Sequence, residues 1–171
     1  MAASLLDAMP AAEARDALLR CCGSSRWAEG VIAGRPYRDA RALFAAAEAC
    51  WQSLGREDWL EAFRHHPRIG DREALRAKFA TTRDWAAAEQ SAAVAASDAT
   101  LDALAEANRE YEARFGHIFI VCASGKSADE MLALAQARLG NDAEAELRIA
   151  AAEQAKITRL RLEKLLTEVP R

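Results

Sequence analysis

Alanine-rich segments with apolar residues at three- and four-residue spacing, each ended by Gly or Pro, restrict most strongly how this chain folds. The clearest is YRDARALFAAAEACWQSL at 37–54, which stops at Gly55. Hydrophobic residues make up 51% of the 171 residues but aromatic residues only 6%, and Ala dominates the apolar set. Because Ala favours helices and is poor in strands, we predict one all-α domain over residues 1–171, a bundle of about eight helices.

The ends of the helices are predicted from Gly, Pro and capping residues. Pro67 disfavours the α conformation in the residue before it, so we expect His66 at or just beyond a helix end. Asp98 and Asp142 are expected N-caps, and SADE at 127–130 matches a capping box. The helices are expected within residues 10–22, 24–34, 37–54, 56–66, 71–79, 84–96, 98–115, 127–139 and 142–166.

One segment departs from the helical pattern. HIFIVCAS at 117–124 lies between Gly116 and Gly125, is rich in β-branched residues and is too short for a core helix. We predict a short extended or irregular segment, whose backbone N–H and C=O groups lack helical partners. Either side chains and water satisfy these groups, or the groups bind a small polar ligand, and the pattern leaves both open.

Charge and composition exclude several classes of protein. The formal net charge is −3 with acids and bases interspersed, so we expect neither a nucleic-acid nor a membrane partner. No apolar run reaches the length of about 18 residues typical of a transmembrane helix, and the N-terminus lacks a signal-peptide pattern. None of the four cysteines forms a C-x-x-C pair, so we expect reduced thiols in a cytoplasmic protein.

Glu89 is the only charged residue within 86–96. On a helix it shares a face with Trp85 and Ala92, and no Lys or Arg lies three or four positions away. Burial of such a carboxylate is costly unless its pKa rises or another element supplies a partner. A solvated Glu89 on an exposed face is the alternative, and the pattern does not decide between them.

Arg161 lies between Ile157 and Leu165 at four-residue spacing, so its guanidinium projects from an apolar line. Nearby Arg159 and Lys164 have ordinary acidic and solvent neighbours, which singles out Arg161. Its side chain either extends to the surface along its aliphatic stem or reaches into a pocket. In a pocket, the planar guanidinium would hold a carboxylate with two hydrogen bonds.

His65 and His66 are adjacent and precede Pro67. Neighbouring helical residues point about 100° apart, so both imidazoles cannot serve one site. We expect His66 to act as a general acid or base near neutral pH and His65 to be a solvated helix-end residue. A metal is not expected, because no H-x-x-x-H or H-x-x-E-H spacing occurs and His117 is the only other histidine.

Four blocks of sequence resemble one known family in order and in register. They are HPRIGD at 66–71, EQ at 89–90, NREYEARFGHIFIVCASGKS at 108–127 and ARLGNDAEAELRIAAAEQAKITRLRL at 137–162. The family is OHCU decarboxylase of the bacterial type, the 2-oxo-4-hydroxy-4-carboxy-5-ureidoimidazoline decarboxylase that completes the conversion of urate to allantoin. The resemblance runs from about residue 5 to residue 165.

The resemblance implies an all-α homodimer that decarboxylates this small-molecule ureidoimidazoline to (S)-allantoin without cofactor or metal. The family's catalytic histidine, glutamate and arginine fall on His66, Glu89 and Arg161. Which of His66 and Glu89 protonates the product carbon stays undecided. The substrate-binding positions fall on Pro67, Gln90, Phe119, Ile120, Val121, Cys122 and Ala123.

The chain departs from the family pattern at two places. Residues 86–88 are all Ala where many members have a Ser, and 116–119 read Gly-His-Ile-Phe where many read Gly-Phe-Pro-Phe. The first removes a hydroxyl, and the second brings a third imidazole near the site. Two other functions stay open: a non-enzymatic helical module that binds a purine-breakdown ligand, and a lyase or hydrolase for another ureido or hydantoin ring.

Overall fold

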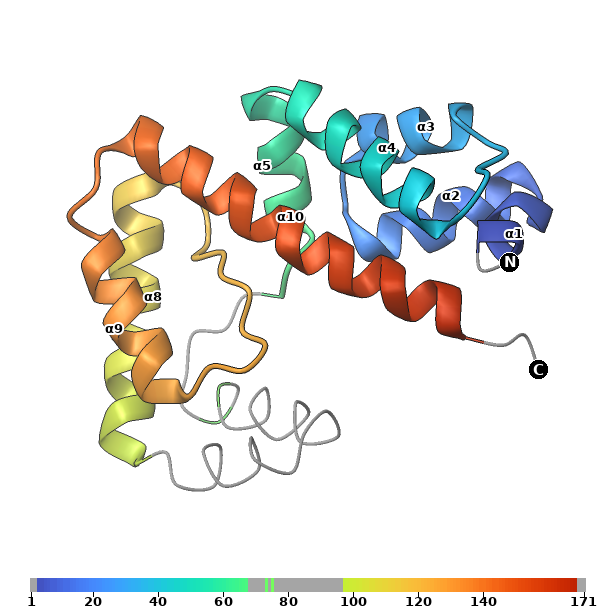
Figure 1. Ribbon diagram of the computed structural model, residues 1–171. Helices are drawn as coiled ribbons and strands as arrows, with labels where there is room; N and C mark the ends of the chain where they lie inside the picture. Colours follow the sequence, from blue (N-terminus) through green and yellow to red (C-terminus); the bar gives the residue numbers. More distant parts are fainter. Residues whose placement is uncertain (1–2, 68–72, 74, 76–96, 169–171) are drawn as a thin grey trace. The chain divides into compact units, whose positions relative to one another are not determined.

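The computed structural model describes residues 3–67, 73, 75 and 97–168 (Figure 1). Eight helices and no strand occur among these residues, which confirms the predicted all-α class. The chain divides into two compact units: unit 1 consists of residues 1–66 and 151–171, and unit 2 of residues 67–150. A single domain over 1–171 stays a prediction, and each unit is described by itself.

Unit 1 contains five short helices and the second part of a long one. The segment expected to be helical over 37–54 becomes helical only at Ala40, because Asp39 caps the helix and its Oδ1 accepts a hydrogen bond from the Ala42 N–H at 2.8 Å. The first helix has no counterpart among the predicted ones. The helices are α1 (Ala3–Ala8), α2 (Ala11–Cys21), α3 (Ser25–Ala33), α4 (Ala40–Ser53), α5 (Arg56–Arg64) and, from Ala151 on, α10 (Ala143–Thr167).

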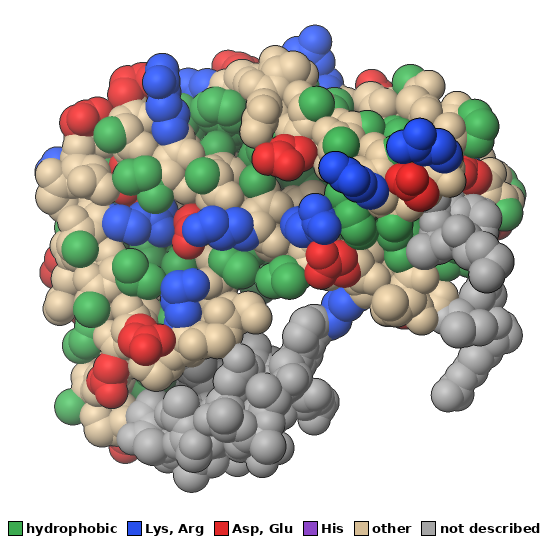
Figure 2. Space-filling view, viewed as in Figure 1, with side chains coloured by type: hydrophobic (Ala, Val, Ile, Leu, Met, Phe, Trp, Pro, Cys, Tyr) green, Lys and Arg blue, Asp and Glu red, His purple; other side chains and the backbone are tan. Residues whose placement is uncertain are grey.

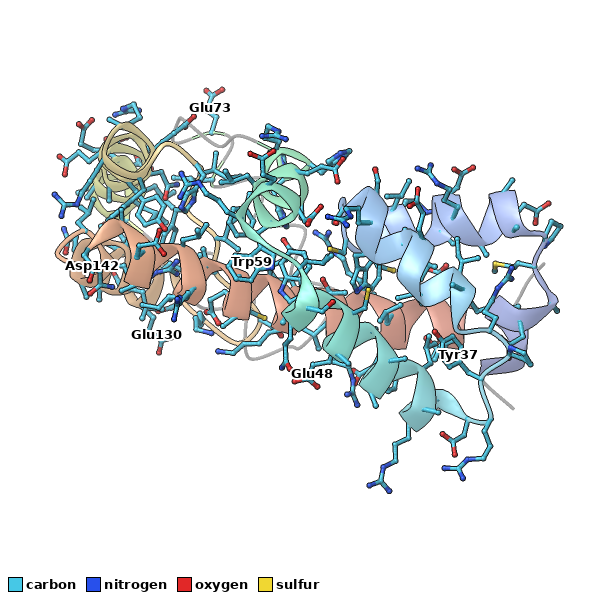
Figure 3. All side chains as sticks on the ribbon, turned by 90° about the horizontal axis from the view of Figure 1, so that it is seen from above. Tyr37, Glu48, Trp59, Glu73, Glu130 and Asp142 are labelled. Carbon is cyan, nitrogen blue, oxygen red and sulfur yellow. The ribbon has the colours of Figure 1, made fainter. Side chains whose placement is uncertain are left out.

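Tryptophan side chains join the helices of unit 1. Trp27 of α3 is fully buried, and its Nε1–H donates to the Ala47 carbonyl of α4 at 3.0 Å. Trp51 of α4 donates in the same way to the Ala151 carbonyl of α10 at 2.9 Å. Trp59 of α5, labelled in Figure 3, lies with its ring centroid 6.2 Å from that of Trp51. These rings bury a large apolar area while each N–H keeps a partner, which stabilises the packing.

Unit 2 contains α8 (Asp98–Phe115), α9 (Ala128–Arg138) and the first part of α10. Helices α8 and α9 lie side by side (Figure 1). Between them apolar side chains form the core of the unit, so the irregular segment that joins α8 to α9 is held at both ends. The core includes Leu101, Leu104, Ala107, Val121, Met131 and Ala135.

The caps of the helices in unit 2 match the predictions with one exception. Ser127 and Glu130 form the capping box of α9, and Asp142, labelled in Figure 3, caps α10. The prediction for α8 is wrong by one residue, because Ser97 is the N-cap and its Oγ accepts a backbone N–H at 3.1 Å. Asp98 is instead the first helical residue, where its negative charge interacts favourably with the helix dipole.

Acidic and basic side chains are interspersed over the described part of the face in Figure 2. This agrees with the sequence, in which 23 Lys and Arg residues nearly balance 26 Asp and Glu residues. Of the helices described, none combines the length and the apolar character that a membrane crossing requires, the 25-residue α10 included.

Candidate active site

His66 lies where the chain leaves α5, directly before Pro67. His65 is the C-cap of that helix, so His66 is just beyond the last helical turn, as predicted. The His66 side chain is half-buried, and its Nε2 lies 2.5 Å from Oε1 of Gln154 on α10. Gln154 is fully buried. An internal partner therefore holds one nitrogen of the imidazole.

Gln154 begins a row of buried polar side chains that we call the polar row: Gln154, Thr158 and Cys22. The amide Nε2–H of Gln154 donates to Thr158 Oγ1, one helical turn further along α10, at 3.1 Å. The Thr158 hydroxyl in turn lies near the Cys22 thiol. Burial raises the pKa of Cys22 to about 11, although hydrogen bonds from the Ser24 N–H and Thr158 oppose this rise. The thiol is therefore neutral near physiological pH.

His65 is exposed, yet its ring packs on the turn between α2 and α3. A Cβ atom added to Gly23 would lie 2.4 Å from Cγ of His65. Only a glycine allows ring and backbone to approach so closely. His65 therefore has a packing contact in addition to the solvated position that the sequence predicts.

Arg161 lies on α10, two helical turns beyond Gln154, a rise of about 10.5 Å along one helix face. Its side chain is exposed, which corresponds to the surface alternative, and its Nη1 lies 3.5 Å from the Arg20 carbonyl. The guanidinium charge opposes the effect of burial on Cys21, but burial prevails and raises the pKa of that thiol to about 11. Arg161 is thus an exposed cation whose charge acts on the buried thiols of Cys21 and Cys22.

The irregular segment between Gly116 and Gly125 has its carbonyl groups held by the protein. Both glycines have positive φ, 78° and 74°, and residues 118–123 have no regular secondary structure, as predicted. Four carbonyls of the segment accept hydrogen bonds, so these C=O groups have partners within the protein. The pairs are His117 Nδ1–H to Ile118 (3.0 Å), Arg138 Nη1–H to Ile120 (2.7 Å), Lys126 Nζ–H to Cys122 (2.8 Å) and Lys126 N–H to Ala123 (3.1 Å).

The backbone N–H groups of the same segment, unlike its carbonyls, have no partner there: none of those in residues 119–123 donates to an acceptor within the described part of the chain. Ile120, Val121 and Cys122 are only 2%, 7% and 8% exposed, and unpaired buried donors are costly unless something accepts from them. Paired acceptors beside unpaired donors suit a ligand that presents oxygen atoms.

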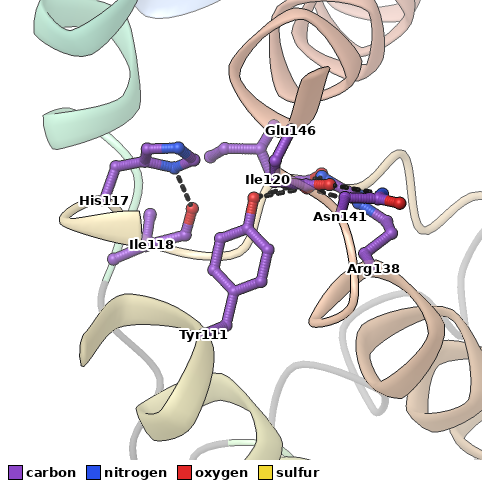
Figure 4. A network of polar contacts seen from close by, with 7 residues as sticks. All are labelled: Tyr111, His117, Ile118, Ile120, Arg138, Asn141 and Glu146. Atoms are coloured by element: carbon purple, nitrogen blue, oxygen red, sulfur yellow. Dashed lines mark hydrogen bonds and ion pairs between the residues drawn. The ribbon is translucent and has the colours of Figure 1, made fainter. Parts of the chain in front are cut away.

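A buried ion pair between Arg138 and Glu146 holds one carbonyl group of this segment (Figure 4). Arg138 of α9, which donates to the Ile120 carbonyl, also pairs with Glu146 of α10 at 2.5 Å. The Tyr111 hydroxyl and the Asn141 amide donate to the two oxygens of the same carboxylate, at 2.5 and 3.0 Å. Arg138 and Glu146 have side chains only 8% and 0% exposed. No local spacing in the sequence pairs these residues, because they come from three helices and a turn.

His117 packs beside Tyr111, and both residues are drawn in Figure 4. Its side chain is 8% exposed, and its ring meets that of Tyr111 edge-on with centroids 5.5 Å apart. Phe115 and Phe119 also contact Tyr111, at 4.6 and 5.2 Å between centroids. The third imidazole of the chain therefore belongs to an aromatic cluster that flanks the irregular segment.

Some predicted residues lie outside the described part of the chain. These are Glu89 and Gln90, the three alanines at 86–88, and the helices expected over 84–96 and most of 71–79. Of the others, His66 and Arg161 belong to unit 1, and Pro67 and residues 119–123 to unit 2. Among the residues described, no group of three or more His, Cys, Asp or Glu is placed to hold a metal ion.

Comparison with known proteins assigns the chain to a family. A family model described as OHCU decarboxylase matches residues 7–163, nearly the full sequence. The chain belongs to the OHCU decarboxylase family. This confirms the family predicted from the four sequence blocks at 66–71, 89–90, 108–127 and 137–162.

Two relatives support the assignment at the level of sequence. The "Uric acid degradation bifunctional protein TTL" of Arabidopsis thaliana is 40% identical over 151 residues, which is 86% of this chain and 46% of that protein. The chain thus spans less than half the length of the plant relative. The 2-oxo-4-hydroxy-4-carboxy-5-ureidoimidazoline decarboxylase of Amia calva is 30% identical over 140 residues, covering 81% of this chain and 79% of that protein.

Solved structures support the family assignment at the level of fold. A crystal structure of OHCU decarboxylase in the presence of (S)-allantoin matches with a TM-score of 0.72 and 36% identity, over 90% of this chain and 99% of that one. A crystal structure of (S)-allantoin synthase matches with a TM-score of 0.70 over 95% of this chain and 52% of that one. At 20% identity, the second match shows a shared fold and nothing more.

Proposed function

We propose that this chain decarboxylates 2-oxo-4-hydroxy-4-carboxy-5-ureidoimidazoline to (S)-allantoin without a cofactor. The observation that carries the proposal is the segment 119–123, whose N–H groups have no acceptor among the described residues while Arg138 and Lys126 hold three of its carbonyls. Membership of the OHCU decarboxylase family supports the reaction. The 36% identical structure, which was determined in the presence of (S)-allantoin, supports the choice of enantiomer.

The substrate supplies its own electron sink, which removes the need for a cofactor. One ring carbon carries a carboxylate and a hydroxyl and adjoins a C=N bond. When the bond to CO2 breaks, its electron pair forms a C=C bond and the C=N electrons move to the nitrogen, which takes up a proton. The hydroxyl then loses its proton as a carbonyl forms, and the neighbouring carbon gains a proton on one face. The protein must orient the ring and move these protons.

We assign the proton transfers to His66 and Glu89 and the binding of an anionic edge to Arg161. An imidazole titrates near neutral pH, so it can take and return a proton during turnover. A guanidinium pairs with a carboxylate through two parallel hydrogen bonds. The one described contact of Arg161, at 3.5 Å, is long, so little is lost when the side chain turns to a substrate.

The backbone donors of the irregular segment are assigned to the oxygens of the substrate ring and its ureido group. Main-chain N–H groups that are already fixed in place bind oxygen without a cost in side-chain entropy. Arg138 keeps the Ile120 peptide oriented, so the donors on either side of it keep their direction. Pro67 and Gln90 are proposed to line the same substrate.

We further propose that the protein is a cytoplasmic homodimer. The family resemblance supports the dimer, and four free thiols fit a reducing compartment. Light scattering after size exclusion measures the assembly. The expected mass is about twice the 18.6 kDa of one chain, and a single-chain mass contradicts the dimer.

Circular dichroism during turnover tests the proposed reaction. The unstable substrate is generated from urate with urate oxidase and the hydrolase that follows it, and the optical activity of the allantoin is followed after this protein is added. We expect rapid appearance of the (S) enantiomer. Slow, racemic product at the spontaneous rate contradicts the proposal. Ligand binding without product would then favour a binding module, and turnover of another ureido ring would favour a related lyase or hydrolase.

A further inference from the structure

The Gln154 amide lies between the His66 ring and Thr158, with its oxygen toward the ring and its nitrogen toward Thr158. The distance from His66 Nε2 to Gln154 Oε1 is 2.5 Å, and the Gln154 amide N–H donates to Thr158 Oγ1 at 3.1 Å. The Thr158 hydroxyl and the Ser24 N–H also lie near the Cys22 sulfur, where both oppose the rise in the pKa of that thiol.

The reverse orientation of the Gln154 amide would put its NH2 group toward the ring and its carbonyl toward Thr158, so it would require a lone pair on Nε2 of His66. Gln154 and Thr158 are 0% and 6% exposed, so solvent does not replace a lost hydrogen bond there. The structure has the amide carbonyl toward His66, and a carbonyl oxygen can only accept, so this contact requires a proton on Nε2 of the ring.

We propose that Gln154 is the positioning residue of His66, holding the neutral imidazole as the Nε2–H tautomer, so that Nδ1 is the nitrogen that exchanges protons. A side-chain amide neither accepts nor releases a proton near neutral pH, so Nε2 cannot exchange its proton with this partner. The role of Nδ1 rests on the proposed decarboxylation. The tautomer itself does not.

Nitrogen-15 NMR reads the tautomer in the full chain without substrate. The protein is labelled with 15N-histidine, and His66 is assigned by the signal lost in His66→Gln. Correlation of ring protons with ring nitrogens distinguishes a protonated nitrogen from one with a lone pair. We expect protonated Nε2 and unprotonated Nδ1 in the neutral ring. A predominantly Nδ1–H ring in the wild type overturns the proposal.

Substitution of Gln154 links the tautomer to turnover. In Gln154→Leu we expect both tautomers and a loss of kcat of about 10-fold or more with a smaller change in KM, because part of the protein has the proton on the wrong nitrogen. Gln154→Glu keeps an acceptor for Nε2–H, so it is expected to restore the tautomer and part of the lost kcat. The control Gln52→Leu replaces an exposed glutamine of α4 and should change neither.

The two readouts separate this inference from the proposed function. A wild-type Nε2–H ring in a protein that forms no (S)-allantoin contradicts the decarboxylation and leaves Gln154 as the residue that holds His66. Unchanged tautomer and kcat in Gln154→Leu overturn the positioning role. If that variant does not fold, Thr158→Val of similar shape takes its place. It removes the acceptor for the amide, and we expect it to shift the same NMR signals toward a mixture.

Discussion

The two neighbouring histidines at the end of α5 have different surroundings, and they form a matched pair for mutagenesis. His66 is half-buried and bonded to Gln154, whereas His65 is exposed and packs on Gly23. A glutamine at either position keeps a polar side chain but cannot transfer protons. A difference in turnover between the two variants therefore measures the loss of the His66 imidazole and not a general disturbance of the helix end.

His66→Gln is expected to lower kcat by about 10²-fold or more, because a general acid or base is lost. His65→Gln should keep most of the turnover. Steady-state rates with substrate generated in situ measure both. Equal losses in the two variants contradict the assignment of His66.

Arg161→Lys is expected to raise KM, because one ammonium group cannot reproduce a two-pronged contact with a carboxylate. Arg159→Lys is the control on the same helix: Arg159 pairs with Glu163 at 2.7 Å and lies over the Phe44 ring. Unchanged KM and kcat in Arg161→Lys count against its role in binding.

At this scale the sequence predicts residues that interrupt a pattern. His66 stands before a proline and Arg161 lies within an apolar line, so both are visible as exceptions. Gln154 is not visible in this way, because a neutral amide in AAAEQAK looks like any helix surface residue. Only its buried contact with His66, a residue 88 positions away in the sequence, distinguishes Gln154 from other helix residues.

At the scale of elements, local signals predict the ends of the helices well. Gly and Pro stop the backbone by themselves, so α2, α4 and α5 end where the sequence predicts, within one or two residues. The cap of α8 is different, because Ser97 and Asp98 are both good caps. The extended backbone of Ser97, with φ −71° and ψ 154°, decides between them, and this depends on the path of the preceding chain.

Gly23→Ala is expected to displace the end of α5. The added Cβ would meet the His65 ring at 2.4 Å, so the turn and the ring cannot both keep their places. We expect a lower melting temperature and reduced kcat, because His66 follows directly. Gly55→Ala is the control, since a Cβ there meets nothing within 4 Å. Wild-type melting and turnover in Gly23→Ala would show that the contact is dispensable.

Arg138→Met is expected to destabilise the fold by about 3–5 kcal/mol, because Glu146 is left as an unpaired buried charge. The double variant Arg138→Met with Glu146→Leu removes both charges and should recover much of this loss in chemical denaturation. Its activity should stay low, because the Ile120 carbonyl has lost its donor in both variants. Recovery of activity together with stability contradicts a role of Arg138 in holding the irregular segment.

For the whole molecule, the all-α class follows from the sequence because Ala content and helical periodicity are summed over many residues. The division into two compact units does not, because it depends on contacts between distant segments. Residues 1–66 and 151–171 form one unit although 84 residues separate them. The network of Arg138 and Glu146 escapes prediction for the same reason.

The stability of the whole molecule should decline in alkali. Burial raises the pKa of Cys21 and of Cys22 from 9.0 to about 11, so the folded chain keeps protons that the unfolded chain loses above pH 9. The contribution to the free energy of unfolding is therefore complete below pH 9. It falls by about 1.4 kcal/mol per pH unit and thiol until about pH 11.

Urea denaturation between pH 9 and pH 11 measures this decline. A variant with both Cys21→Ala and Cys22→Ala lacks the two thiols and should show a shallower pH dependence, even if it is less stable at neutral pH. An equally steep decline in that variant assigns the effect to other groups, such as Tyr111, whose pKa burial also raises.

The proposed binding of substrate by the N–H groups of residues 119–123 has a consequence for how this protein can evolve. Main-chain N–H groups are the same in every residue except proline, so side chains in this segment can drift without altering what the backbone recognises. A new ligand preference would then arise by insertion, deletion or a proline, not by ordinary point substitution. Such a binding surface is conservative in function even where its sequence varies.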